Sequence, residues 1–239
     1  NNLSIKTFFQ ILIIVLIPSI LTFLEPDTGV VIIYLITTIA MIIYHGIKKK
    51  WYLIFSCIIF IIGSGIIYLY FFQKDLLFSL FGNNLYYRLE RLFNWSKGSG
   101  YQLENSIIAI GSAGLFGFGF NNIPLYYPEA STDFIFTSFA TSFGFLGSII
   151  LICVILYFYF NILSYTKGKI KKRDKYLLFG ISIMIIYQQI QNISMTIGLL
   201  PITGITLPFI SYGGSSLLSY MFTIGLVLNI TKKREKYLN

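Results

Sequence analysis

Long apolar stretches separated by short polar segments dominate the pattern along the chain. Several of them are long enough to cross the hydrocarbon core of a membrane, about 30 Å thick, as a helix of roughly 20 residues. They show no alternation of apolar and polar residues, which argues against a transmembrane β-barrel. The pattern predicts an all-α fold, a polytopic helical membrane bundle of about six spans, at residues 7–24, 29–47, 51–72, 134–165, 176–199 and 212–230.

Composition agrees with a membrane protein. Hydrophobic residues make up 56% of the 239 residues and charged residues only 11%, whereas a soluble domain carries about 25% charged residues. The first span resembles an ordinary membrane helix and not a cleavable signal peptide, because no small-residue cleavage site follows it. Cys57 and Cys153 both lie inside apolar runs, so we expect packing residues and no disulfide.

A loop of about 60 residues, 73–133, separates the third and fourth predicted spans. Loops of this length are functional or disordered, and the apolar patches of this one predict a segment folded against the membrane surface. Leu85, Leu89 and Phe93 recur every four residues, which predicts a short amphipathic helix in the outer interface. Gly-rich residues 111–119 follow no strand, so they do not form a dinucleotide-binding fingerprint.

The basic residues predict the orientation. The net charge is +9, but the Lys and Arg residues cluster between spans, so nucleic acid is not an expected partner. Fourteen of the 18 fall on one face, which the positive-inside rule makes cytoplasmic, together with both termini. Contact with anionic membrane lipids is a further role for these clusters. Turn 25–27, loop 73–133 and turn 201–216 then share the outer face.

Asp133 is the residue with the strongest chemical interest. It lies directly before a long span, where a carboxylate must face water, a cavity or a partner, because a charge at the bilayer centre costs about 2.5–3.5 kcal/mol. Partial burial would raise its pKa and suit a general base. The alternative is a helix N-cap, a position that Asp and Thr favour.

Two turns on the outer face are candidates for supporting roles. Glu25-Pro26-Asp27 could bind a cation or position a polar substrate, or it could be a Pro-initiated turn in which Asp27 caps the second helix. In segment 201–216, two prolines and three glycines interrupt an apolar sequence. We expect a broken or re-entrant segment lining a cavity, because irregular backbone at membrane depth is tolerated only where protein buries it or water reaches it. Its serines at 211, 215 and 216 could bond a polar ligand or satisfy freed carbonyl groups.

Arg88 and Arg91 are three residues apart and share one helix face. Their planar guanidinium groups suit a diphosphate, although they could equally reach lipid headgroups. The sequence has neither a Cys/His cluster nor a Walker motif, so zinc chemistry and ATP-driven transport are unsupported and no metal site is assigned.

Taken in order, the motifs resemble one family, the SEDS proteins, which are the RodA/FtsW/SpoVE cell-wall polymerases of bacteria. Residues 25–27 are similar to the family's Gln-Pro-Asp turn, and residues 100–117 to a loop motif. Residues 128–136 resemble its signature outer-loop motif, and residues 198–216, with Asn192, its last-loop motif. The resemblance implies that residues 1–239 form a single SEDS-type domain, the C-terminal part of about six of the family's ten spans, without the N-terminal spans.

The resemblance implies a glycosyltransferase that polymerises lipid II into glycan strands on the outer face of the bacterial cytoplasmic membrane, in cell-shape or division control. Asp133 matches the acidic residue that the family requires and is the expected catalytic residue, with polyprenyl diphosphate as leaving group. A class B penicillin-binding protein is the expected partner, and a diphosphate makes a divalent cation plausible without any certain cofactor. The predicted substrate-binding residues are Arg88, Arg91, Glu129, Thr132, Ser211, Ser215 and Ser216. The predicted structural-motif residues are Glu25, Pro26, Asp27, Pro201, Gly204, Pro208, Gly213 and Gly214.

The chain departs from the family pattern at a few positions. Ser131 stands where the family has His, and Thr141 and Ser142 stand where acidic residues are usual. Two other functions remain open. A flippase for lipid-linked precursor would need a polar path, for which Gln188, Gln189, Gln191 and Asn192 are candidates unless they only join helices. A non-catalytic scaffold for a penicillin-binding protein would tolerate replacement of Asp133.

Overall fold

The computed structural model describes residues 5–25, 27–46, 49–79, 86, 89–90, 100–120, 122, 124–166 and 170–236, and within these ranges every regular element is a helix. The prediction of an all-α fold is therefore confirmed. The predicted amphipathic helix around residues 85–93 lies largely outside the described residues. The helices are α1 (Ile5–Leu24), α2 (Thr28–His45), α3 (Lys49–Phe72), α5 (Tyr101–Ser112), α6 (Ile135–Thr166), α7 (Lys172–Thr196) and α8 (Gly214–Lys236).

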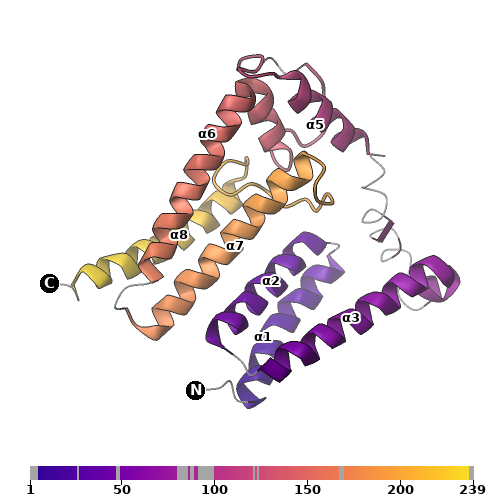
Figure 1. Ribbon diagram of the computed structural model, residues 1–239, viewed down its shortest axis with the longest axis vertical. Helices are drawn as coiled ribbons and strands as arrows, with labels where there is room; N and C mark the ends of the chain where they lie inside the picture. The colour runs from indigo at the N-terminus through magenta and orange to yellow at the C-terminus, as the bar shows by residue number, and fades with distance from the viewer. Residues whose placement is uncertain are drawn as a thin grey trace.

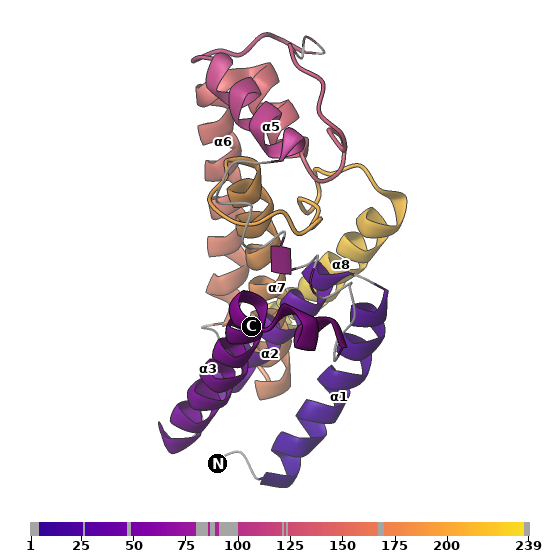
Figure 2. The ribbon, with the colours of Figure 1, turned by 90° about the vertical axis from the view of Figure 1, so that its right-hand side faces the viewer.

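Helix α7 is the centre of the bundle. It packs against α2, α5, α6 and α8, and α1 packs on the far side of α2. Helix α3 lies at the edge of the molecule, and α5 lies at one end, beside the start of α6 (Figure 1). The view turned by 90° shows the same end position for α5 (Figure 2).

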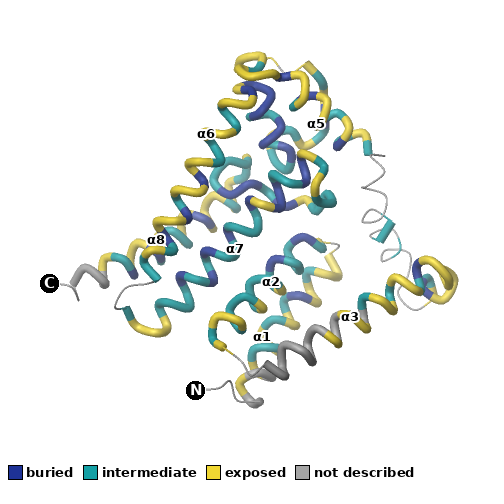
Figure 3. Tube along the Cα trace, in the orientation of Figure 1, coloured by how far each residue is buried: buried dark blue, intermediate teal, exposed yellow. Residues whose placement is uncertain are grey.

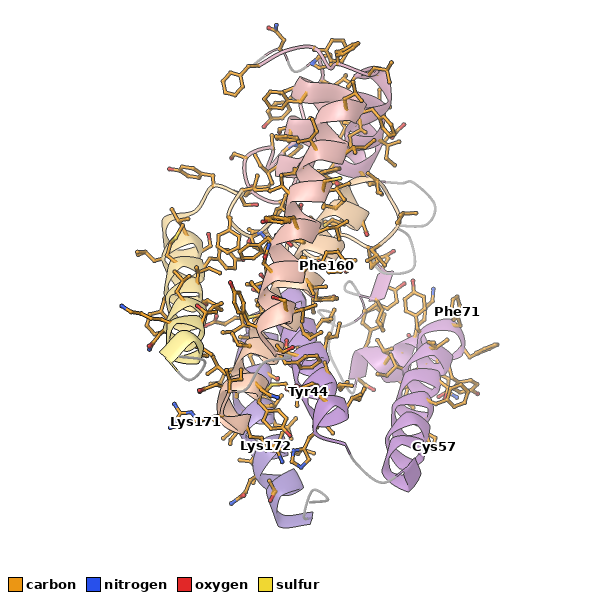
Figure 4. All side chains as sticks on the ribbon, turned by 60° about the vertical axis from the view of Figure 1, so that its left-hand side comes forward. Tyr44, Cys57, Phe71, Phe160, Lys171 and Lys172 are labelled. Atoms are coloured by element: carbon orange, nitrogen blue, oxygen red, sulfur yellow. The ribbon has the colours of Figure 1, made fainter. Side chains whose placement is uncertain are left out.

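The long helices coincide with the predicted spans. Four of them, α2, α6, α7 and residues Gly214–Lys232 of α8, are long and apolar enough to cross a membrane. Within the described residues, α1 and α3 contribute the shorter apolar stretches Gln10–Leu24 and Gly63–Phe72. Large side chains such as Phe160, which is 72% exposed, point away from the bundle where lipid would lie (Figure 4).

The fourth predicted span is not one straight helix. Gly144 has φ 66° and ψ −163°, so the polypeptide kinks there and divides α6 in two. The second half, from Phe145 to Thr166, is about 33 Å long at 1.5 Å per residue and by itself matches the hydrocarbon thickness. The nine residues before the kink are therefore free to build the end of the molecule that carries α5.

The kink is held by backbone contacts with the glycine-rich loop that follows α5. Phe118 N–H donates to Thr141 O at 2.9 Å, and Phe145 N–H donates to Gly114 O at 3.0 Å. A Cβ on Gly117 or on Gly144 would collide with the backbone of the opposite segment. Both glycines have positive φ, so these positions require glycine for two independent reasons.

Buried residues concentrate in α5, the first half of α6, α7 and the loop after α7 (Figure 3). Ser106 joins three helices: its hydroxyl donates to Thr196 O at 2.8 Å and lies 2.6 Å from Thr137 Oγ1. Because the single Ser106 hydrogen is used on Thr196, Thr137 is the donor in the second bond. All three residues are fully buried, so this junction fixes α5 against α6 and α7.

The opposite end of α7 carries the predicted cytoplasmic features. Lys171 and Lys172 lie where α7 begins, near Tyr44 of α2 (Figure 4). Tyr176 packs on Tyr44 edge to face and its hydroxyl lies 2.8 Å from His45 Nδ1, so the only histidine is part of a contact between α2 and α7.

Candidate functional site

Asp133 ends a tight turn that leads into α6. Glu129 adopts φ 56°, and its carbonyl oxygen accepts from Thr132 N–H at 3.2 Å and from Phe134 N–H at 3.0 Å. The Glu129 side chain also accepts from Thr132 Oγ1 at 2.6 Å. A left-handed conformation at a non-glycine residue costs about 1–3 kcal/mol, and it persists where the surroundings fix it. Here the hydrogen bonds from Thr132 and Phe134 of the same turn fix the conformation of Glu129.

The residues before this turn are anchored to the first half of α6. Ser138 Oγ donates to Ala130 O at 2.7 Å and lies 2.9 Å from the Tyr127 hydroxyl. Tyr127 and Phe134 are both 1% exposed and pack together with Ala109 of α5. The turn is thus attached to the buried core, although Glu129 itself is exposed.

The carbonyl oxygens of three consecutive residues, 131 to 133, all accept hydrogen bonds from distant parts of the chain. Tyr212 N–H donates to Ser131 O at 2.9 Å. Ser211 Oγ donates to Thr132 O at 2.7 Å. Asn192 Nδ2 donates to Asp133 O at 2.8 Å and to Ile205 O at 2.7 Å. The loop after α7 and the end of α7 therefore hold the backbone that bears Asp133.

The Asp133 carboxylate faces this loop and is half-buried. A Cβ placed on Gly204 would lie 3.5 Å from Asp133 Oδ2, so the absence of a side chain at Gly204 leaves space beside the carboxylate. Burial raises the pKa of the Asp133 carboxyl above its ordinary value, and the negative charges of Glu129 and Asp27 raise it further. A carboxyl with a raised pKa is a stronger base when ionised.

Asp133 does not cap α6 in this structure. The helix begins at Ile135, and among the described residues no backbone N–H donates to the Asp133 side chain. Asp27 is the carboxylate that caps a helix: its Oδ1 accepts from Val30 N–H at 3.1 Å at the start of α2. The capping alternative is therefore correct for Asp27 and wrong for Asp133.

The predicted broken segment is observed. Residues 197–213 are non-helical and separate α7 from α8. Gly204 has φ 71°, Pro208 is buried, and Leu207 is fully buried against Phe136 and Ala140 of α6. A Cβ on Gly29 would lie 2.7 Å from Thr203 O, so the start of α2 also packs directly on this loop.

The serines predicted to bind substrate have different surroundings. Ser211 Oγ both donates to Thr132 O and accepts from Leu207 N–H at 2.7 Å, so its hydroxyl is engaged within the protein. Ser216 Oγ donates to Gly213 O at 3.0 Å in the first turn of α8, and Ser215 is exposed. Within the part of the chain that the structure describes, no hydrogen bond joins Ser215 or Ser216 to the Asp133 turn.

Some of the remaining predicted site residues are described by the structure, and others are not. Arg88, Arg91 and Pro26 are not among the described residues. Gly213 and Gly214 lie at the start of α8, and Pro201 O accepts from Gln191 Nε2 at 2.9 Å. Across the described ranges, no three His, Cys, Asp or Glu side chains are close enough together to hold a metal ion.

Sequence reasoning placed Asn192 in a motif and in a polar cluster without a role at the Asp133 site, and it gave Ser106 and Ser138 no such role, although each connects the Asp133 region to another helix or loop. Asn192 carried the clearest signal, because it is a polar residue inside an apolar predicted span. The other two are small hydroxyl residues, which are frequent in helices and give no indication of their partners.

Comparison with known proteins places this architecture in a family. The family model FTSW_RODA_SPOVE, described as cell cycle protein, matches residues 1–236. The probable peptidoglycan glycosyltransferase FtsW of Coxiella burnetii is 35% identical over 244 residues, which cover 97% of this chain and 62% of that protein. The chain thus spans about three fifths of the length of this relative.

Two solved structures share the fold. One, from a study of structural coordination of polymerization and crosslinking by a peptidoglycan synthase complex, has a TM-score of 0.72 at 21% identity and covers 97% of this chain and 63% of its own. The other, a mutant of the Thermus thermophilus rod shape determining protein RodA, has a TM-score of 0.62 at 21% identity and covers 98% and 59%. With the helical bundle and the motifs around Asp133 and residues 197–213, these matches show that the chain belongs to the FtsW/RodA/SpoVE family, the SEDS membrane proteins.

Proposed function

We propose that the protein of which this chain is part is a glycosyltransferase that polymerises lipid II into glycan strands, with Asp133 as general base. The observation that carries the proposal is the Asp133 carboxylate itself. It is half-buried, has a raised pKa, and lies beside the space left by Gly204. The name of the Coxiella burnetii relative, a probable peptidoglycan glycosyltransferase, supports the class of reaction.

In the proposed reaction, Asp133 accepts the proton of a sugar hydroxyl on one lipid-linked unit. The oxygen attacks the anomeric carbon of a second unit, and the bond from that carbon to the diphosphate oxygen breaks. Polyprenyl diphosphate leaves with the electron pair. Arg88 and Arg91 would offset its charge, and a divalent cation is a possible alternative for that task. General base catalysis contributes about 10²–10⁴-fold to such a rate.

The proposed location is the outer face of the bacterial cytoplasmic membrane, with both termini of this chain in the cytoplasm. The support is the distribution of charge. Lys171, Lys172 and Arg173 lie at the end of α7 opposite to the Asp133 turn, and basic residues in short loops mark the cytoplasmic side. A class B penicillin-binding protein is the proposed partner, since one solved structure of this fold comes from a complex that coordinates polymerization and crosslinking.

The polar residues of α7 do not favour a flippase. Gln188 Oε1 accepts from the Tyr220 hydroxyl of α8 at 3.0 Å, and Gln189 Oε1 accepts from the Tyr159 hydroxyl of α6 at 2.6 Å. Side chains engaged in bonds between helices supply cohesion in a membrane bundle. They would have to break these bonds to line a path for a polar headgroup.

The test is polymerisation of purified lipid II by the full-length protein with its penicillin-binding partner, comparing wild type with Asp133→Asn. We expect glycan strands from the wild type and none from a variant that still folds and binds its partner. Equal activity of the two would reject the proposed mechanism. A wild type that moves lipid II across vesicle membranes without forming strands would identify a flippase instead.

A further inference from the structure

We propose that Asn192 and Ser211 are positioning residues that fix the backbone bearing Asp133, an inference that rests on the function proposed above. Neither side chain needs to contact substrate. Each donates to a main-chain oxygen of the turn, Asn192 to Asp133 O and Ser211 to Thr132 O. With Tyr212 N–H on Ser131 O, three successive carbonyl groups are held by donors of α7 and the loop after it.

This arrangement matters because the carboxylate is not held by its own bonds. Among the described residues, no donor bonds to the Asp133 side chain, so its position depends on the backbone that carries it. Catalytic groups must be held within a fraction of an ångström, and a misplacement of about 1 Å can cost about 100-fold in rate. The three carbonyl bonds restrict the turn in this way, since a rotation of the Asp133 peptide would break at least one of them.

Asn192 contributes more than Ser211 to fixing the backbone that bears Asp133. It is fully buried, and its amide nitrogen spans the gap between Asp133 O and Ile205 O. Both acceptors are carbonyl oxygens, so the amide must present its nitrogen to them, and its Oδ1 has no partner. The residue therefore sets the distance between the Asp133 turn and the loop that carries Gly204, which determines the space in front of the carboxylate.

Ser211 reinforces the same junction from the other end of the loop. Its hydroxyl accepts from Leu207 N–H at 2.7 Å and donates to Thr132 O at 2.7 Å. One hydroxyl thus closes the turn at 207–211 and connects it to the residue before Asp133. Threonine could supply the same hydroxyl, whereas alanine could not.

The chain offers a matched control beside Asn192. Gln191 is 3% exposed, and its side-chain amide also bonds a carbonyl oxygen of the loop after α7, Pro201 O at 2.9 Å. It makes no described bond to residues 131–133. Gln191→Ala therefore removes a similar buried bond to the same loop without releasing the Asp133 turn.

The experiment measures kcat, KM and the pH profile of lipid II polymerisation by the full-length protein with its partner, after thermal unfolding has established the folded fraction. Asn192→Ala should lower kcat by about 100-fold with little change in KM. Ser211→Ala should lower kcat less, and Ser211→Thr should restore it. Gln191→Ala should lower the unfolding temperature and leave kcat close to that of the wild type.

The pH profile separates positioning from general destabilisation. The pKa of Asp133 is raised by burial and by Glu129 and Asp27, and loop 197–213 carries no Asp, Glu, Lys, Arg or His. If Asn192→Ala releases the turn, the carboxylate gains access to water, its pKa falls, and the acid limb moves to lower pH. The proposal would be overturned if the acid limb of the pH profile did not move in Asn192→Ala, or if Gln191→Ala lowered kcat as much as Asn192→Ala. If Asp133→Asn were fully active, the proposed function would fail first, and the two failures are therefore distinguishable.

Discussion

The region around α5, the first half of α6 and loop 197–213 is held together differently from the region formed by α1, α2 and α3. In the first, buried hydroxyl and amide groups such as those of Ser106 and Asn192 bond backbone oxygens of other elements. In the second, large apolar side chains such as Ile14, 70% exposed, and Phe60, 73% exposed, face outward. The polar bonds of the first region fix the relative positions of its helices and loops, and the second region presents an apolar surface that suits lipid.

The difference shows where the sequence is constrained. A helix facing lipid needs length and apolar side chains, and many sequences satisfy both. The Asp133 region needs individual donors and glycines at fixed places, because a buried carbonyl group without its partner costs about 1–3 kcal/mol. The proposed chemistry is located in the region where we expect substitutions to be least tolerated.

The largest effect on stability should come from an added methyl group at the kink of α6. Gly144→Ala should destabilise the protein by about 3 kcal/mol, since it forces a positive φ on alanine and drives Cβ into the Gly117 segment. Gly65→Ala in α3 is the matched control, because no atom lies within 4 Å of a Cβ there. It should be neutral or stabilise by up to about 1 kcal/mol. Thermal unfolding in detergent compares the two, and equal effects would refute the contrast between the regions.

A smaller effect is expected from the bond between α6 and α7. Tyr159→Phe removes the hydroxyl that donates to Gln189 Oε1 at 2.6 Å and leaves that oxygen buried without its donor. The free energy of unfolding should fall by about 0.6 kcal/mol and by no more than about 1.7 kcal/mol, the mean and the maximum measured for hydrogen bonds between membrane helices. Tyr157→Phe, two residues earlier and 72% exposed, should have no effect on the unfolding temperature. A lower unfolding temperature in both variants would indicate that the destabilisation does not come from losing the hydrogen bond to Gln189.

The smallest effect concerns the stability of the site itself. The folded-state pKa of Asp133 is raised, so protonation stabilises the folded form at low pH, and this contribution is lost as pH rises through the folded-state pKa. Near neutral pH the ionised carboxylate is therefore destabilising. Asp133→Asn should unfold at a slightly higher temperature than wild type at neutral pH, and the difference should shrink in acid. A lower unfolding temperature at neutral pH would mean that the carboxylate has a stabilising partner.

Much of the fold could be predicted from hydropathy alone. The bounds of α2, α6 and α7 agree with the predicted spans to within a few residues, except at the start of α7, since an apolar run of this length has few alternatives to a helix. The irregular segment after α7 was indicated by Pro201 and Pro208, which remove backbone donors. The cap at Asp27 followed from its place directly before an apolar run.

The details of the site could not be predicted because they depend on contacts between distant residues. Asn192 and Asp133 are 59 positions apart, and Ser211 and Thr132 are 79 apart. No local pattern specifies that Thr132 O would be the partner of the Ser211 hydroxyl, or that Gly117 would pair with the kink at Gly144. The glycine-rich loop shows this most clearly, since its glycines alone did not indicate the close backbone packing on α6 that the structure shows.

The most direct measurement compares two carboxylates in the same polymerisation assay. Asp133→Asn and Asp27→Asn each remove one negative charge, and asparagine at position 27 keeps the ability to cap α2. With the full-length protein, its partner and lipid II, we predict that Asp133→Asn forms no glycan strands, while Asp27→Asn retains most of the wild-type rate. Strand synthesis by Asp133→Asn at the rate of Asp27→Asn would contradict the assignment of Asp133 as the base.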